Sequence, residues 1–258
     1  MNKKRILLVG LCLITCSAGA LARQDGQWGW TLGFDYSEGD YGNPQETEIL
    51  YVPLTARYDT GRWTFRATLP WVSIEGPGGV VPELGNVQGR TGKARREESG
   101  IGDGVGSATY NLSPGGGPAP IIDLTGKVKL PTASESRGLG TGEVDLAGQV
   151  DFYKPIAPDT TGLLTLGYTI LGDPPGVTLR NVFYGSFGAV YQIDEAVSIG
   201  ASFDFRQRVI AGGEPQRELL GFVGYRRDRY WRVQGYVVQG LSDGSPDWGV
   251  GAVAIREY

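Results

Sequence analysis

Apolar and polar residues alternate along most of this chain, and they do so most regularly between residues 121 and 152. Two runs, Ile121–Leu130 and Glu143–Phe152, flank a loop rich in Gly, Ser and Thr. In each run one parity is apolar, whereas the other carries charges such as Lys127, Lys129 and Asp145. A period of two is typical of a β-strand with one apolar and one polar face. The pattern therefore predicts a hairpin of two amphipathic strands.

The same alternation recurs along the rest of the chain, which gives about twelve predicted strands. They are Trp28–Tyr36, Ile49–Tyr58, Trp63–Trp71, Ile101–Leu112, Ile121–Leu130, Glu143–Phe152, Leu163–Leu171, Leu179–Gln192, Val197–Arg208, Leu219–Arg226, Trp231–Gln239 and Trp248–Arg256. The facing of Leu179–Gln192 is not fixed by its mixture of Gly and aromatic residues. Pro53 and Pro70 lack a backbone donor, so we expect local strain or a bulge at both positions.

The connections between these strands differ in length in a regular way. Those after even-numbered strands are short, such as Asp59–Arg62, whereas those after odd-numbered strands include the long Gly76–Glu98 and Pro131–Gly142. Ser242–Pro246 is a short exception. An even number of strands with short turns at one rim is the layout of a bacterial outer-membrane barrel. We therefore predict an all-β fold: a single closed antiparallel transmembrane β-barrel with short periplasmic turns and longer extracellular loops.

The alternative is a secreted soluble β-sandwich, whose strands alternate in the same way. Aromatic residues near predicted strand ends, such as Trp28, Trp63 and Trp231, favour a membrane because interfacial girdles need them there. In a barrel, Lys127 and Lys129 must face the lumen, because each would cost roughly 2–4 kcal/mol in lipid near the midplane.

The same parity predicts a set of charged residues that line the lumen and are candidates for solute transport. They are Asp35, Arg57, Arg66, Asp103, Asp123, Lys127, Lys129, Asp145, Asp151, Asp204, Arg206, Arg208 and Arg232.

The amino terminus has the features of a secretory signal. A basic start is followed by an apolar stretch from Ile6 to Ile14 and by an Ala-x-Ala sequence that ends at Ala22. We therefore expect a cleaved signal peptide over residues 1–22 and a barrel over residues 23–258, exported to the outer membrane of a Gram-negative bacterium. A lipoprotein site at Cys16 is the competing interpretation. Both cysteines, Cys12 and Cys16, precede the cleavage point, so no disulfide is expected in the mature chain.

Composition narrows the possible chemistry. The chain has no histidine, which excludes Ser-His hydrolysis and most zinc sites. Its net charge of −4 gives no support to nucleic-acid binding. Gly138-x-Gly140-x-Gly142 precedes a strand, whereas a phosphate loop precedes a helix, so it does not predict a nucleotide site. We expect no enzyme activity, no cofactor and no metal; the expected partners are outer-membrane lipid and a small-molecule solute.

One segment resembles a known family. Lys127–Thr132 followed by Gly138–Asp145, together with Ser99–Asp103 and Leu69-Pro70-Trp71, is similar to the outer-membrane barrels labelled "putative MetA-pathway of phenol degradation". The chain departs from that pattern at Ala133, where a Gly is expected. The resemblance implies a barrel with a transporter-like role in the uptake of aromatic or other small organic compounds.

Two functions follow from these predictions. The first is a channel or transporter through which small solutes diffuse passively along a charged lumen. The alternative is a non-conducting structural or interaction barrel, in which Gly76–Glu98 acts as a plug or binding loop. Neither the solute nor the oligomeric state is indicated by the sequence.

Overall fold

The structure is a computed structural model that describes residues 26–81, 84–87, 95–117 and 119–258. The predicted signal peptide lies outside the described residues. The described strands are β1 (Gln27–Gly39), β2 (Thr47–Thr60), β3 (Trp63–Gly76), β4 (Val80–Val81), β5 (Gly85–Asn86), β6 (Arg96–Ile101), β7 (Gly104–Gly116), β8 (Ala119–Leu130), β9 (Asp145–Ala157), β10 (Thr160–Ile170), β11 (Val182–Gln192), β12 (Val197–Arg206), β13 (Gln216–Arg226), β14 (Trp231–Gly240) and β15 (Trp248–Glu257). A short 3-10 helix, η1, spans Glu135–Arg137.

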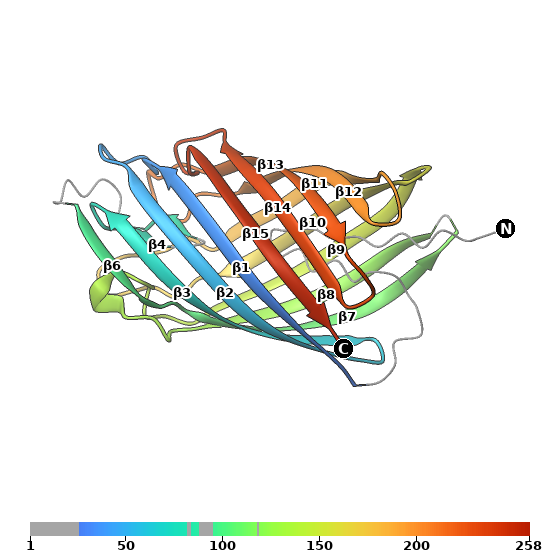
Figure 1. The fold of residues 1–258 in the computed structure, drawn as a ribbon. Coiled ribbons are helices and arrows are strands. Elements are labelled where there is room, and N and C mark those ends of the chain that lie inside the picture. Colours follow the sequence, from blue (N-terminus) through green and yellow to red (C-terminus); the bar gives the residue numbers. More distant parts are fainter. Residues whose placement is uncertain (1–25, 82–83, 88–94, 118) are drawn as a thin grey trace.

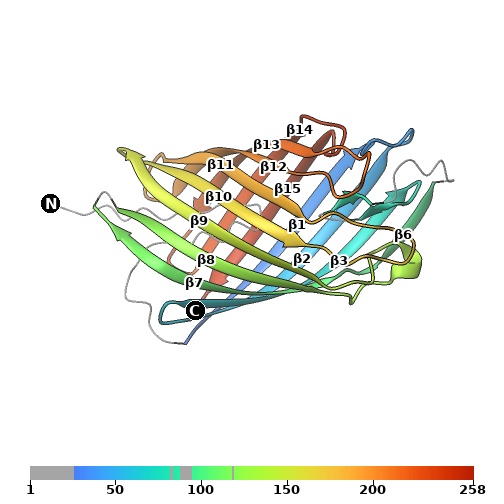
Figure 2. The same cartoon turned by 180° about the vertical axis from the view of Figure 1, so that it is seen from behind.

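The strands form one closed antiparallel barrel (Figures 1 and 2). Its sheet has 13 strands, and β15 pairs with β1 to close it. Because β6 and β7 follow one another and both pair with β3, they occupy one strand position in the barrel, which therefore has twelve strand positions. This confirms the predicted all-β barrel and its strand number. The short hairpin β4–β5 stands apart from the barrel sheet.

The two rims differ as the connection lengths predict. At one rim, here called the turn end, β2–β3, β9–β10 and β13–β14 are joined by tight turns. At the other, the loop end, long segments join β3 to β6 and β8 to β9 (Figure 1). Asp194 shows how a tight turn is held, because its Oδ1 accepts the N–H groups of Ala196 and Val197, both at 2.7 Å. These two bonds hold the pKa of Asp194 below its usual value.

Several predicted strand boundaries are wrong. β7 continues to Gly116 and β9 to Ala157, so residues 113–116 and 155–157 belong to strands although they were predicted to be turns. Both segments contain a proline, Pro114 or Pro155, but each lies near a strand end, where a missing ladder donor costs little. Conversely, Glu143 and Val144 precede β9, and β11 begins only at Val182. The predicted loop Gly76–Glu98 contains β4, β5 and the start of β6.

The bulge or strain predicted at Pro53 and Pro70 is not found in the pairing of the two strands that carry them. Pro53 and Pro70 lie directly opposite each other, and the β2–β3 register continues through them without a bulge. The irregularities occur in the neighbouring strands. Pairing of β1 with β2 is interrupted near Pro53, and the partner of β3 changes from β7 to β6 around Pro70. The missing donors therefore weaken the ladders on the far sides of the two strands.

The outer face of the barrel is apolar. Outward residues such as Phe183, 58% exposed, and Val237, 60% exposed, carry large hydrophobic side chains that water would not favour. Aromatic pairs lie near both rims: ring centroids are 4.9 Å apart for Trp28 and Tyr58 at the turn end and 4.6 Å apart for Tyr168 and Phe183 at the loop end. An apolar band between two aromatic girdles is the surface that a transmembrane barrel presents to lipid. Across the described part of the chain, no helix has the length and apolar character needed to cross a membrane.

Candidate functional site

The inner wall of the barrel carries most of the charged residues predicted to line the lumen. Alternating exposure along the strands and the cross-strand register together show which residues point inward. Inward strand positions are occupied by Asp35, Arg57, Arg66, Asp123, Lys127, Lys129, Asp145, Asp151, Asp204, Arg206 and Arg232. Asp103 lies in the break between β6 and β7, and Arg208 lies beyond the end of β12 and is exposed. The parity of β11 is now defined, because Ser186 and Val190 are buried whereas Phe187 and Tyr191 are exposed.

Antiparallel pairing arranges the inward residues in rows that cross the strands. One row, the acidic row, follows the register from β7 to β13 through seven polar residues. Its members are Asn111, Asp123, Asp151, Thr165, Ser186, Asp204 and Glu218. A second row, the basic row, lies on the loop side of the acidic row and consists of Arg57, Arg66, Ser107 and Lys127. Between them runs a neutral row of Thr64, Thr109, Thr125 and Gln149, continued by Gly167 and Tyr184.

The acidic row is held mainly by neutral donors. Asn111 Nδ2 donates to Asp123 Oδ1 at 2.6 Å. Asp151 accepts from Thr165 Oγ1 at 2.6 Å and from Gln149 Nε2 at 2.7 Å. These two carboxylates therefore obtain their described hydrogen bonds from amide and hydroxyl groups, and Lys127 of the basic row adds a favourable electrostatic interaction with Asp151.

Two arginines of the turn end are paired with acids outside the acidic row. Arg57 Nε lies 2.7 Å from Asp59 Oδ2, and Arg57 Nη1 lies 3.3 Å from Glu257 Oε1. Arg232 pairs with the same oxygen of Glu257. Both arginine side chains are partly buried, and a partly buried cation needs an acidic partner to offset its lost hydration.

An apolar row borders the acidic row on its turn side. It consists of Ile121, Tyr153, Leu163, Gly188, Ser202, Leu220 and Val238. Tyr153, Leu163 and Leu220 pack in one buried cluster together with Phe222 and Tyr236.

Inward aromatic rings lie over glycines of neighbouring strands. A Cβ on Gly167 would lie 2.2 Å from Tyr184 Cζ, and one on Gly200 would lie 2.3 Å from Phe222 Cζ. The missing side chains therefore let these rings lie flat against the wall, so that they take less space in the lumen.

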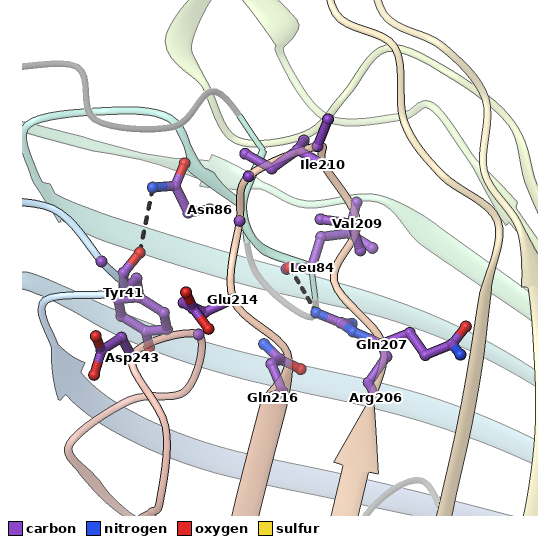
Figure 3. Close-up of a pocket in the computed structure, with 15 residues that line it drawn as sticks. Tyr41, Leu84, Asn86, Arg206, Gln207, Val209, Ile210, Glu214, Gln216 and Asp243 are labelled. Atoms are coloured by element: carbon purple, nitrogen blue, oxygen red, sulfur yellow. Dashed lines mark hydrogen bonds between the residues drawn. The ribbon is translucent and has the colours of Figure 1, made fainter.

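Two adjoining cavities lie inside the loop half of the barrel. The inner cavity, about 340 Å³, is lined by residues from all three polar rows, including Lys127, Gln149 and Glu218. The outer cavity, about 280 Å³, lies among the loops and is shown in Figure 3. Both cavities touch Leu84 and Arg206, and Arg206 Nη2 donates to the Leu84 carbonyl at 2.5 Å. This contact stands where the two cavities meet.

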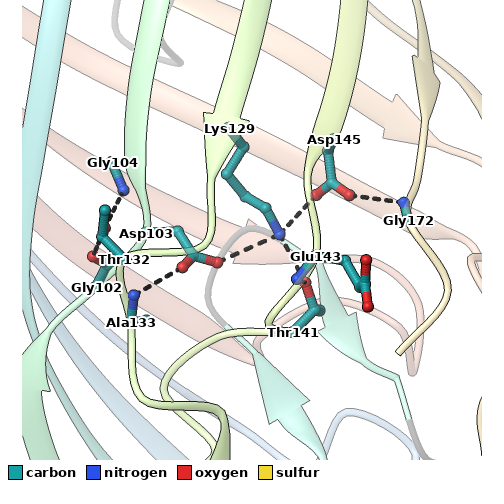
Figure 4. Close-up of polar contacts among 10 residues, drawn as sticks. All are labelled: Gly102, Asp103, Gly104, Lys129, Thr132, Ala133, Thr141, Glu143, Asp145 and Gly172. Atoms are coloured by element: carbon teal, nitrogen blue, oxygen red, sulfur yellow. Dashed lines mark hydrogen bonds and ion pairs between the residues drawn. The ribbon is translucent and has the colours of Figure 1, made fainter. Parts of the chain in front are cut away.

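Lys129 is the centre of a second polar network, shown in Figure 4. Its Nζ lies 3.3 Å from Asp103 Oδ2 and 2.7 Å from Asp145 Oδ2, and it donates to Thr141 Oγ1 at 2.8 Å. The remaining oxygens of the two acids are also used: Asp103 Oδ1 accepts from the Ala133 N–H at 3.0 Å, and Asp145 Oδ1 accepts from the Gly172 N–H at 2.9 Å. The network joins the β6–β7 break to the loops after β8 and β10.

The sequence did not single out several residues of the wall. Glu218 and Glu257 were missed because each lies one residue outside its predicted strand, Leu219–Arg226 or Trp248–Arg256, whereas the observed strands include them. Tyr184 was missed because the facing of its predicted strand, Leu179–Gln192, was not fixed. Gln149 was visible on the polar face of its predicted strand but carries no charge. Among the described residues, no group of three or more His, Cys, Asp or Glu residues is placed to hold a metal ion.

Comparisons with solved structures place the fold among outer-membrane barrels. The chain is similar to the COG4313 outer membrane channel from Pseudomonas putida F1, with a TM-score of 0.66, 15% identity, and coverage of 92% of this chain and 97% of that chain. It is also similar to the NanC porin, with a TM-score of 0.55, 9% identity, and coverage of 88% and 98% respectively. At these identities the likeness concerns the fold. No model of a protein family matches the chain, and no curated protein matches its sequence.

Proposed function

We propose that this protein is an outer-membrane channel through which small solutes diffuse passively. The observation that carries the proposal is the contrast between its two faces. The outer face is apolar and suited to lipid, whereas the inner wall is polar, charged and hollowed by adjoining cavities of about 340 and 280 Å³. A polar interior is what water-filled barrels need and what a structural barrel does not need. The similarity in fold to outer-membrane channels agrees with this proposal.

The solutes we propose are small organic compounds, aromatic ones included. The lining of the inner cavity supports this choice, because Tyr51, Val105 and Leu171 give an otherwise polar space a surface for an apolar group. A relation to the barrels labelled "putative MetA-pathway of phenol degradation" is part of the same proposal, supported by the segments around Lys129 and Asp145. So is export by the signal peptide over residues 1–22, with residues 23–258 as the mature barrel in the outer membrane of a Gram-negative bacterium.

Within this function, the inward charged residues divide into two groups. Lys129, Asp103 and Asp145 bind one another and the loops, which suits them to holding the wall. Others, such as Asp204 and Arg206, line the inner cavity, where a passing solute would meet them.

A non-conducting barrel is the second candidate, and one contact favours it. Arg206 bonds to Leu84 where the outer and inner cavities meet, so a permanent contact there would obstruct the route. The same contact in a conducting barrel acts as a constriction that limits the current.

Conductance of the purified mature protein in planar bilayers separates the two functions. We expect discrete channel openings, and larger ones in Arg206→Ala, because the substitution removes the side chain that bonds to Leu84. Lys154→Ala is the matched control, since it removes an exposed cation near the turn end. A heat-modifiable, folded barrel that stays silent in both the wild type and Arg206→Ala would overturn the channel function.

A further inference from the structure

Arg256 is a charged side chain on the outer face of the barrel, near the turn end. It is exposed and has the parity of Val250 and Ala252, which face outward on β15. The register places it between Trp30 of β1 and Trp231 of β14, which also occupy outward positions. A cation on the lipid face is costly at the midplane but costs little near the interfaces. Arg256 therefore marks the headgroup level of the turn-end leaflet.

Aromatic rings accompany this arginine and a second one in the adjacent β13–β14 turn. Arg256 Cζ lies 5.0 Å from the centre of the Trp231 ring and 4.8 Å from that of Tyr258, at the end marked C in Figure 1. Arg229 Cζ lies 4.5 Å from the centre of the Tyr230 ring, and its Nη2 also donates to the Tyr230 hydroxyl. Ring contacts use the face of a guanidinium, so donors at its edge remain for an acceptor. We call the following residues the arginine–aromatic patch: Arg229, Arg256, Trp30, Tyr230, Trp231 and Tyr258.

One acid, Asp228, lies among these arginines and serves mainly to hold the turn. Its Oδ1 accepts the N–H groups of Tyr230 at 2.7 Å and of Trp231 at 2.9 Å. Its Oδ2 lies 4.0 Å from Arg227 Nε. The two turn bonds hold the pKa of Asp228 below its usual value, and the charges of Arg227 and Arg256 add to this effect. Asp228 is therefore charged and offsets only part of the positive charge around it.

Positive charge remains after the neighbouring acidic side chains are counted. Glu257, the next residue of β15, faces the lumen, where Arg57 and Arg232 bind it. Within the part of the chain that the structure describes, neither Arg229 nor Arg256 forms an ion pair. The patch is thus suited to an anionic partner.

We propose that the arginine–aromatic patch binds the phosphate group of an anionic phospholipid in the turn-end leaflet of the membrane. A guanidinium presents planar pairs of N–H donors that match phosphate oxygens, and charge-assisted bonds of this kind are stronger than neutral ones. Trp and Tyr suit the same depth, because their amphipathic rings lie at the level of the headgroups. The patch therefore offers a cation to the phosphate and ring surface to the adjoining glycerol and first methylene groups.

The exposed rings favour a lipid over a soluble anion. Beside Arg256, Trp30 is 45% exposed and Tyr258 is 59% exposed. A free phosphate ion would contact the guanidinium and leave this apolar surface in water, whereas a phospholipid covers the rings and the cation together. The short turns of an outer-membrane barrel lie on the periplasmic side, so the proposed lipid belongs to the periplasmic leaflet.

Native mass spectrometry of the folded mature protein in detergent tests this inference. The protein is titrated separately with phosphatidylglycerol, with phosphatidylcholine and with inorganic phosphate. We expect phosphatidylglycerol to bind most tightly and inorganic phosphate to bind weakest. The variant Arg229→Gln with Arg256→Gln should lower the affinity for the first phosphatidylglycerol about tenfold or more, which corresponds to one lost charge-assisted hydrogen bond.

Lys154→Gln is the matched control, because it removes an exposed cation near the same rim, and its phosphatidylglycerol affinity should equal that of the wild type. A heat-modifiable gel shift shows that each variant is folded. If the double variant does not fold, Arg229→Gln alone tests the patch from an exposed turn position. Equal phosphatidylglycerol affinities in the patch variant and the control would overturn the inference, as would binding of inorganic phosphate as tight as that of the lipid. Either result leaves the channel function untouched.

Discussion

Replacing Lys129 by Met should destabilise the barrel and loosen the loops at its loop end. The substitution keeps much of the aliphatic length but removes the cation between Asp103 and Asp145. Both acids then remain on the wall with their charge uncompensated. Thr141 also loses the donor that binds its hydroxyl oxygen.

The expected magnitude follows from burial. The Lys129, Asp103 and Asp145 side chains are only 12%, 9% and 6% exposed, so solvent screens the two ion pairs weakly. Removing one member of a buried ion pair costs about 3–5 kcal/mol because the remaining charge is left uncompensated. We expect a loss in the unfolding free energy near the lower figure, because the lumen lets some water reach the two acids.

Urea-dependent loss of the heat-modifiable form measures the global effect, and limited proteolysis of the 131–144 loop measures the local one. Lys154→Met is the matched control, because Lys154 lies on β9 but is exposed. The triple variant Lys129→Met, Asp103→Asn, Asp145→Asn should recover much of the stability, since it removes the uncompensated charges together with the cation.

Two outcomes would refute this reasoning. One is a Lys129→Met barrel whose stability and loop cleavage match those of the Lys154→Met control. The other is a triple variant that is no more stable than Lys129→Met alone, because the cost would then come from lost packing and not from the charge of the two acids.

Two more predictions concern the two faces of the wall. Leu166 is 47% exposed on the outer face, so Leu166→Lys places a charge in lipid and should lower the unfolding free energy by roughly 2–4 kcal/mol if the site lies near the midplane. Leu166→Ala is the control. Equal urea midpoints for the two variants would contradict a lipid-facing position. Gly167→Val should push the Tyr184 ring into the inner cavity and reduce single-channel conductance, because even a Cβ there would lie 2.2 Å from the ring. Adding Tyr184→Ala to Gly167→Val should restore the conductance. Gly148→Val is the control and should leave the wild-type conductance unchanged, because a Cβ on Gly148 would have no neighbouring atom within 4 Å.

The sequence predicted the fold well because a barrel wall repeats one simple requirement. Each strand separates lipid from lumen, so its residues alternate, and runs such as Ile121–Leu130 show it without any tertiary information. The prediction was poorest where local features compete with that rule. In β11, Gly and aromatic residues occur at both parities, and the last residues of β7 and β9 were assigned to the connections that follow them.

The rows of the inner wall could not be predicted, because they depend on the register between strands. Parity places Asp123, Asp151 and Asp204 inside, but their membership of one row follows from pairings across five successive strands. Register is set jointly by turn geometry and by irregularities, such as the shift between Asn111 and Ser113 in β7. A shift of two residues in any one pairing would keep every parity and still divide the row.

The most specific segment of the sequence serves the loops more directly than it serves a solute. The residues that carry the family resemblance include Asp103, Lys129 and Asp145, which form the ion pairs of the network in Figure 4. Gly140 belongs to the same segment, and a Cβ there would lie 2.6 Å from Asp103 Oδ2. These constraints concern how the loop after β8 packs on the wall, so barrels with different solutes could share them. Solute preference should instead depend on residues outside that segment that line the inner cavity, such as Tyr184, Asp204 and Glu218.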